Sequence, residues 1–144
     1  GNYGRLEAVN LETGETVWVE RQRAPLTAGT LATAGGLVFT GSLDRMFSAH
    51  DAATGERLWQ LRLNDVPASV PMSYSVDGQQ YVAMVVGPGA SQSRAYTDLV
   101  PEFINPPEHG ATLWVFQVPA PSPGYLWQAD SLPIRHNVSR RPRS

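Results

Sequence analysis

Short runs that alternate apolar and polar residues dominate the chain, and their spacing predicts strands. The segment 57–63 (RLWQLRL) alternates with a period of two, as a half-buried strand does. Asp77-Gly78 is a strong hairpin signal between two such runs. Five further runs have the same β-favouring character: 36–41, 46–50, 71–75, 80–86 and 111–118. No segment has convincing helical periodicity, so we expect an all-β fold.

One stretch of sequence occurs twice, 41 residues apart. LEAVNLETGETVW ends at Trp18, and FSAHDAATGERLW ends at Trp59. A period near 40 residues with four short strands per unit is typical of a β-propeller. The positions that the two copies share are Ala8, Asn10, Thr13, Gly14 and Trp18 in the first copy, and Ala49, Asp51, Thr54, Gly55 and Trp59 in the second.

The shared residues have a structural interpretation. We expect the Asn or Asp side chain to accept hydrogen bonds from turn amides, and the glycine of Thr-Gly to take a positive φ. The tryptophan that follows offers a large flat apolar face, which we expect to pack between neighbouring sheets. These ten positions are therefore predicted to be structural docking residues.

Divided into four-stranded units, the sequence holds about two and a half blades. Residues 4–20 supply the last two strands of one unit, residues 29–63 form a complete unit, and residues 69–118 supply three strands. So few blades do not close a ring, so we expect a fragment or one piece of a larger assembly. The third unit carries a long loop, 87–110, and is expected to lack its closing strand. Residues 1–118 are thus assigned to an incomplete propeller, and the Pro/Arg-rich residues 119–144 to a poorly ordered tail.

The repeat resembles the tryptophan-docking motif of the pyrroloquinoline-quinone (PQQ) dependent dehydrogenases, which are eight-bladed propellers. Residues 29–41 (GTLATAGGLVFTG) resemble a segment of the alcohol-dehydrogenase branch, as do 70–74 and 80–83. The similarity covers about residues 1–118 and only the C-terminal quarter or so of such enzymes.

The resemblance implies oxidation of an alcohol by PQQ, assisted by a catalytic aspartate and a calcium ion. No motif for that aspartate or for the calcium ligands is present, so no catalytic or metal-binding residue is assigned and both are expected outside this segment. The vicinal cysteine pair of many members is also missing. The matching positions imply cofactor contacts through the backbone of Thr27, Ala28, Gly89, Ala90 and Ser91. Some relatives have Trp at the position of Thr27, and many have Gly-Gly-Trp at 89–91, so the sequence departs from the pattern at both places.

The predicted function is that of an oxidoreductase: the C-terminal segment of a periplasmic PQQ-dependent alcohol dehydrogenase, oxidising an alcohol or a similar polyol or sugar. Electrons would pass to a quinone or a cytochrome c. The main partner would be the rest of the same propeller, whose N-terminal part supplies the closing strand in the family. The segment alone is expected to be inactive and to associate through its exposed edges. The alternative is a non-catalytic propeller scaffold with the same repeats, such as an outer-membrane assembly factor.

Composition excludes or disfavours several other functions. The chain has no cysteine, which excludes disulfide and thiolate chemistry within it, and its formal net charge of −2 argues against a nucleic-acid surface. No apolar run is long enough to span a bilayer. The histidines 50, 109 and 136 lack metal-ligand spacing. The carboxylates Asp98, Glu102 and Glu108 of the long loop are either solvated or line a substrate mouth.

Overall fold

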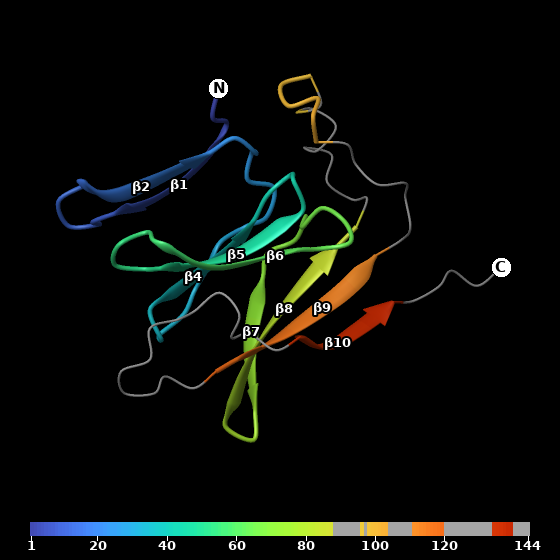
Figure 1. Ribbon diagram of the computed structural model, residues 1–144. Coiled ribbons are helices and arrows are strands. Elements are labelled where there is room, and N and C mark those ends of the chain that lie inside the picture. The colour runs from blue at the N-terminus through green and yellow to red at the C-terminus, as the bar shows by residue number, and fades with distance from the viewer. Residues whose placement is uncertain (88–95, 97, 104–110, 120–133, 140–144) are drawn as a thin grey trace.

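The computed structural model describes residues 1–87, 96, 98–103 and 111–119, together with the backbone of residues 134–139. The described residues contain no helix and form three antiparallel sheets, which follow one another along the chain (Figure 1). This confirms the expected all-β fold, with two strands in the first unit and four in the second.

The first sheet is a hairpin of two strands, and the other two sheets have four strands each. In both four-stranded sheets the strands lie in the order in which they occur along the chain. The strands are β1 (Gly4–Val9) and β2 (Thr16–Gln22) in the first sheet; β3 (Leu31–Ala32), β4 (Leu37–Gly41), β5 (Met46–Asp51) and β6 (Arg57–Arg62) in the second; β7 (Met72–Val76), β8 (Gln79–Val86), β9 (Thr112–Val118) and β10 (Ile134–Ser139) in the third.

The sequence repeat is also a repeat of strand register. Ala8 pairs with Trp18 across β1 and β2, and Ala49 pairs with Trp59 across β5 and β6. In both hairpins the register shifts at the residue after the alanine. Because side chains alternate along a strand, this common register directs the two indoles to the same side of their own sheets.

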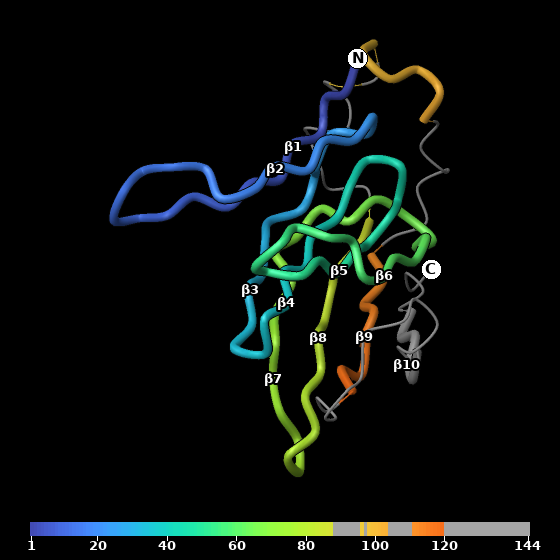
Figure 2. The backbone as a smooth tube through the Cα atoms, turned by 60° about the vertical axis from the view of Figure 1, so that its left-hand side comes forward, coloured from blue at the N-terminus to red at the C-terminus, as the bar shows by residue number. Residues whose placement is uncertain are grey.

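The main core lies between the second and third sheets, which stack face to face (Figure 2). Its side chains alternate along their strands with residues of the opposite faces. In the second sheet the opposite face is covered as well, since Ser48 and His50 of β5 are also buried. The buried members of this core are Leu37, Phe39, Phe47, Ala49, Trp59 and Leu63 from the second sheet and its end, and Val82, Met84, Val86, Phe116 and Val118 from the third.

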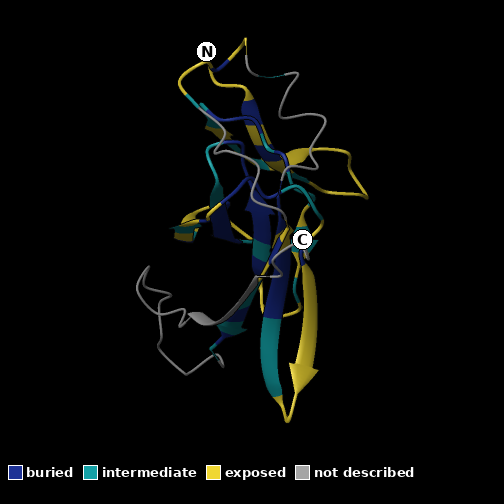
Figure 3. Ribbon diagram, turned by 90° about the vertical axis from the view of Figure 1, so that its right-hand side faces the viewer, coloured by how far each residue is buried: buried dark blue, intermediate teal, exposed yellow. Residues whose placement is uncertain are grey.

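The opposite face of the third sheet is open. β7 is exposed along its whole length (yellow in Figure 3), and it forms the edge of its sheet. Asp77 and Gly78 both have positive φ, 50° and 77°, so they form the tight turn predicted for the β7–β8 hairpin. Several large apolar side chains on β7, β8 and β9 are exposed: Met72, Tyr74, Val76, Val85 and Leu113.

One expectation about the third sheet is wrong. Residues 134–139 of the supposed tail form β10, which pairs antiparallel with β9 and fills the outer position that we expected to be vacant. The unpaired edge of β9 offers a row of N–H and C=O groups that any extended segment can satisfy. Six residues in a Pro/Arg-rich context carry too little apolar periodicity to reveal such a strand. The boundary at residue 118 itself stays a prediction.

Candidate functional site

The repeated turn of the first sheet is held by its own side chains. Asn10 Oδ1 accepts hydrogen bonds from the N–H groups of Glu12 and Thr13, at 2.8 and 3.2 Å. The N–H of Gly14 donates to the carbonyl of Asn10 at 2.8 Å, and Gly14 has a φ of 74°. A residue with a Cβ is strained at that φ, which explains the glycine.

The second copy builds the same turn with an aspartate. Asp51 Oδ1 accepts from the N–H groups of Ala53 and Thr54, at 2.8 and 2.9 Å. The N–H of Gly55 donates to the carbonyl of Asp51 at 2.9 Å, and Gly55 has a φ of 79°. The N–H of Thr54, followed by that of Ala53, stabilises the ionised carboxylate and lowers the pKa of Asp51 below its ordinary value.

Trp18 docks onto the turn of the next sheet. Its Nε1–H donates to the carbonyl of Ala52 at 2.9 Å, and a Cβ built on Gly55 would lie only 2.6 Å from the indole Cε3. Glycine at position 55 therefore serves both the turn and the close approach of the ring. At Gly14, by contrast, a Cβ would meet nothing within 4 Å among the described residues. The two turns have the same backbone conformation, but only the turn at Gly55 has an indole packed against it.

Trp59 lies at the second interface, between the second and third sheets. It is buried, and its ring centroid is 5.4 Å from that of Phe116 on β9, in an edge-to-face arrangement. Phe47 completes the cluster, at 5.3 Å from Phe116 and 6.1 Å from Trp59. Edge-to-face rings at these distances add to the free energy gained by burying their area.

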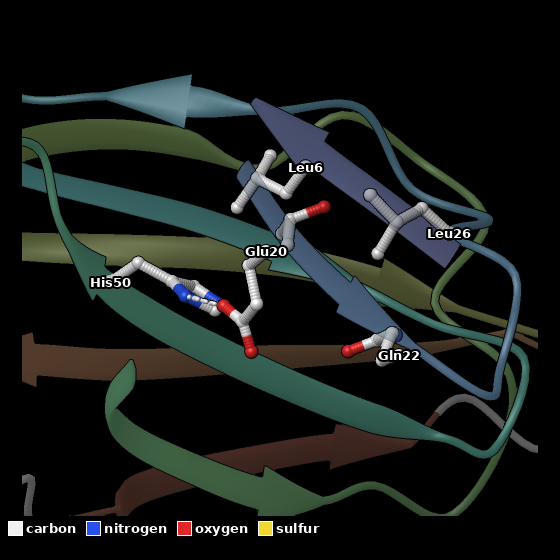
Figure 4. Close-up of a pocket in the computed structure, with 6 residues that line it drawn as sticks. Leu6, Glu20, Gln22, Leu26 and His50 are labelled. Atoms are coloured by element: carbon white, nitrogen blue, oxygen red, sulfur yellow. Dashed lines mark ion pairs between the residues drawn. The ribbon is translucent and has the colours of Figure 1, made fainter. Parts of the chain in front are cut away.

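A polar chain crosses the first interface, between the first two sheets (Figure 4). His50 Nδ1 lies 2.6 Å from Glu20 Oε2 and 3.2 Å from the carbonyl of Gly55. Because both neighbours are acceptors, Nδ1 carries the proton. His50 Nε2 lies 2.9 Å from Ser48 Oγ, so in neutral His50 the serine hydroxyl donates to it. The other oxygen of Glu20 pairs with Arg57.

This Ser48–His50–Glu20 chain has the order of a nucleophile, a base and an orienting acid. However, His50 is 2% exposed and Ser48 is 8% exposed. The pocket beside them, which Leu6, Leu26 and Thr40 also line, has no room for a water molecule. A substrate cannot reach the serine, so the chain acts as a polar tie between the two sheets.

Two of the residues predicted to contact a cofactor, Thr27 and Ala28, lie in the connection between the first and second sheets. Thr27 is buried, its hydroxyl donates to the carbonyl of Pro67 at 2.8 Å, and its N–H donates to the carbonyl of Gly41. The N–H of Ala28 also donates to Gly41, at 3.2 Å. The remaining predicted contacts, residues 89–91, lie outside the described residues. The N–H groups of Thr27 and Ala28 are thus already bonded, so these two residues could contact a cofactor only through their side-chain surfaces and carbonyl groups.

One carboxylate of the long loop is engaged rather than free. Arg23 Nε and Nη2 donate to the two oxygens of Glu102, at 2.6 and 3.2 Å. The hydrogen bond from Arg23 holds the pKa of Glu102 below its ordinary value, and the same partner raises the pKa of Arg23. Asp98 is exposed. Glu108 lies outside the described residues.

A metal site is not formed by the part of the chain that the structure describes. No three His, Cys, Asp or Glu side chains gather there closely enough to hold an ion. His109 lies outside the described residues, and for His136 only the backbone is described.

Among the residues that the structure describes, no helix is long and apolar enough to cross a membrane.

Sequence reasoning missed the polar tie, although the repeat contained a signal for it. In the alignment of the two copies, His50 stands opposite Val9, and Glu20 stands opposite Leu61. Positions where the copies agree build the common turn and place a tryptophan at each interface, whereas the differing positions Val9/His50 and Glu20/Leu61 distinguish the two interfaces. The pairing of Arg23 with Glu102 gives no such signal, because the two residues are 79 positions apart and outside the repeat.

Comparison with known proteins gives a consistent result. Residues 1–82 match the family described as glucose/ethanol/alcohol dehydrogenase, β-propeller domain. A quinoprotein ethanol dehydrogenase of Pseudomonas putida is 41% identical over 117 residues, which cover 81% of this chain and 19% of that protein. Subunit 1 of the methanol dehydrogenase (cytochrome c) of Methylobacterium organophilum is 42% identical over 86 residues, or 60% of this chain and 14% of that protein.

A solved structure shows the same fold. A europium-containing methanol dehydrogenase superposes with a TM-score of 0.68 at 28% identity, covering 81% of this chain and 23% of that one. The chain thus spans about a fifth of the length of the relatives that it matches.

Proposed function

Because this chain belongs to the glucose, ethanol and alcohol dehydrogenase β-propeller family, we propose that it forms blades of a PQQ-dependent enzyme that oxidises an alcohol or a similar polyol or sugar. The observation that carries the proposal is the docked repeat. Trp18 of one sheet sits on Gly55 of the next, in a stretch that is 41% identical to a quinoprotein ethanol dehydrogenase. A stack of rigid sheets is suited to hold a planar cofactor in a fixed orientation.

PQQ would supply the acceptor for the hydride of the alcohol, and the chain would supply part of the walls around it. Thr27 and Ala28, together with residues 89–91, are the proposed contacts. The Thr27 hydroxyl and both N–H groups are already bonded to the carbonyls of Pro67 and Gly41. Thr27 therefore links the β2–β3 connection to β4 and to the β6–β7 connection. It would offer a bound cofactor a van der Waals surface rather than a free hydrogen-bond donor. Calcium ligands and a catalytic carboxylate are proposed to lie outside this segment.

The proposed partners follow from the same assignment. They are the remainder of the same propeller, a small alcohol, and a cytochrome c or a quinone as electron acceptor. One relative is named for a cytochrome c acceptor, which supports the first of these two. A periplasmic location is proposed on the same grounds. The open face of the third sheet, with Met72 59% exposed and Val76 50% exposed, supports covering by another part of the assembly.

The test uses the complete protein that contains this chain. PQQ and calcium are added, and retained quinone is measured by absorbance after gel filtration, together with dye-linked oxidation of a series of alcohols. We expect stoichiometric quinone and activity that is lost when PQQ is omitted. The matched control is the 144-residue chain alone under the same conditions, which we expect to show no turnover.

Two results would contradict the proposal. Absence of retained quinone and of activity with every alcohol, in a correctly folded complete protein, would favour a non-catalytic propeller scaffold. Turnover by the isolated chain would show that the catalytic groups lie within it.

A further inference from the structure

A short segment of the β8–β9 connection lies across the ends of the other sheets. We name Tyr96 and residues 98–103 the strap. Its backbone turns on itself twice: the N–H groups of Leu99 and Val100 donate to the carbonyl of Tyr96 at 3.0 and 3.1 Å, and the N–H of Phe103 donates to Val100 at 3.0 Å. The ribbon and tube views both place the strap beside the N-terminus (Figures 1 and 2).

Arg23, just after β2, binds the strap through its Nε and Nη2 atoms. Besides the two bonds to Glu102, its Nη2 donates to the carbonyl of Leu99 at 3.1 Å, and its Nη1 donates to the carbonyl of Gly1 at 2.7 Å. The guanidinium also lies over the ring of Tyr3, 5.1 Å from the centroid. A planar fork with a bidentate carboxylate and two carbonyl acceptors fixes direction as well as distance, which a single surface ion pair does not.

Val100 fixes the strap from the other side. It is fully buried, and it packs with Leu43 of the β4–β5 turn and Val66 of the β6–β7 connection. Tyr96 and Phe103 pack against this small cluster. The strap thus joins the first sheet, through Arg23, to the second sheet and to the connection that leads to the third.

The strap covers the end of the sheets where Thr27 lies. The N–H of Leu43 donates to the carbonyl of Pro25, two residues before Thr27. Val66 precedes Pro67, whose carbonyl accepts the Thr27 hydroxyl. The apolar cluster under the strap therefore borders the residues proposed to contact the cofactor.

We propose that Arg23 is a positioning residue: it clasps the strap over this end of the sheets, so that the strap forms one wall of the entrance to the cofactor site. The role at the entrance rests on the proposed function, whereas the clasp itself does not. In this proposal Glu102 binds Arg23 as part of the clasp and does not contact the substrate.

The clasp is tested by hydrogen exchange in the complete protein. Arg23→Gln is expected to speed exchange of the Val100 and Phe103 amides about tenfold, because their local opening no longer breaks the clasp, while exchange in β4 and β5 stays unchanged. Arg21→Gln, which removes the same charge from an exposed position on β2, is the matched control and should leave all these amides unchanged. Glu102→Gln should act like Arg23→Gln, and the double variant should exchange no faster than Arg23→Gln alone.

The entrance is tested by kinetics of the same variants. Arg23→Gln should raise KM for the alcohol severalfold while kcat stays within about twofold, since the strap does not touch the reacting atoms. Arg21→Gln should change neither constant. Unchanged exchange in Arg23→Gln, or faster exchange spread evenly over all sheets, would overturn the clasp. Faster strap exchange with KM unchanged would overturn the role at the entrance. An inactive wild-type protein would overturn the proposed function and the entrance with it, and the exchange data would still decide the clasp.

Discussion

The two interfaces between the sheets use opposite chemistry. Between the first and second sheets, contact is made by one docked indole and by the polar tie of Glu20, His50 and Ser48. Between the second and third sheets, contact is made by a continuous apolar layer centred on Trp59 and Phe116. Both tryptophans occupy the same position in the repeat.

A repeat protein can thus keep its turns constant and still vary the interfaces between its sheets. The shared residues fix the turn and the register, and the facing sheet then decides whether an interface is polar or apolar. An apolar layer stabilises in proportion to the area it buries. A buried polar tie contributes less stability, but it is intolerant of mispairing, since any shift leaves an acceptor or donor without its partner. We therefore expect the second interface to dominate stability and the first to select the correct alignment.

The largest effect is expected at the apolar interface. Phe116→Ala removes a fully buried ring that contacts Phe47, Trp59 and Trp114, and it should lower the free energy of unfolding by about 3–5 kcal/mol. Urea denaturation followed by tryptophan fluorescence measures the change. Val85→Ala, on the exposed face of the same sheet, is the control and should cost less than about 1 kcal/mol. Equal costs for the two variants would show that no such core exists.

A smaller effect is expected at the polar tie. His50→Val introduces the residue of the first copy, and it should cost about 1–3 kcal/mol because Glu20 Oε2 loses its ion-pair partner and the Ser48 hydroxyl loses its hydrogen-bond partner. Adding Glu20→Leu, the residue of the second copy, removes the stranded acceptor and should restore part of the loss. A double-mutant cycle from urea denaturation measures this coupling. Strictly additive costs would contradict the tie.

The alignment of the two copies explains what the sequence could and could not predict. The strands within residues 1–118, the repeated turns and the propeller fold follow from local alternation and from the 41-residue repeat, and the structure confirms them. The polar tie depends on which residues of two sheets meet, so it was visible only as the mismatches Val9/His50 and Glu20/Leu61. β10 was not predicted, because its six residues carry too little apolar periodicity to indicate a strand, and its partner β9 is a separate segment of the chain. The contacts proposed for residues 89–91 stay a prediction.

The two turn glycines give a matched comparison of the docked and the open turn. Gly14→Ala should cost about 1–2 kcal/mol from its positive φ alone. Gly55→Ala should cost about 1–3 kcal/mol more, because its Cβ would overlap the Trp18 ring. In a Trp18→Ala background the two glycine variants should cost the same, to within about 0.5 kcal/mol. An excess at Gly55 that persists without the indole would contradict the docking.

The smallest effect concerns Asp51 and pH. Asp51→Asn should cost less than about 0.5 kcal/mol near neutral pH, because Asn10 makes the same turn bonds in the first copy. The pKa of Asp51 is lowered in the folded chain, so the stability from its carboxylate is present above its ordinary pKa and is lost as the pH falls through the lowered value. The difference between wild type and Asp51→Asn should therefore shrink on acidification. Urea midpoints measured from pH 7 down to pH 3 check this, and a difference that grows in acid would reverse the sign.

The placement of the Trp18 ring on the next turn can be observed directly by NMR. Gly14 and Gly55 share backbone geometry, so their α-proton shifts should differ only through the indole over Gly55. We predict that the Gly55 α-protons lie upfield of those of Gly14, and that Trp18→Leu moves them to the Gly14 position. Matching shifts for the two glycines in the wild-type chain would mean that the first sheet is not docked on the second, and the stack of blades on which the proposed function depends would be wrong.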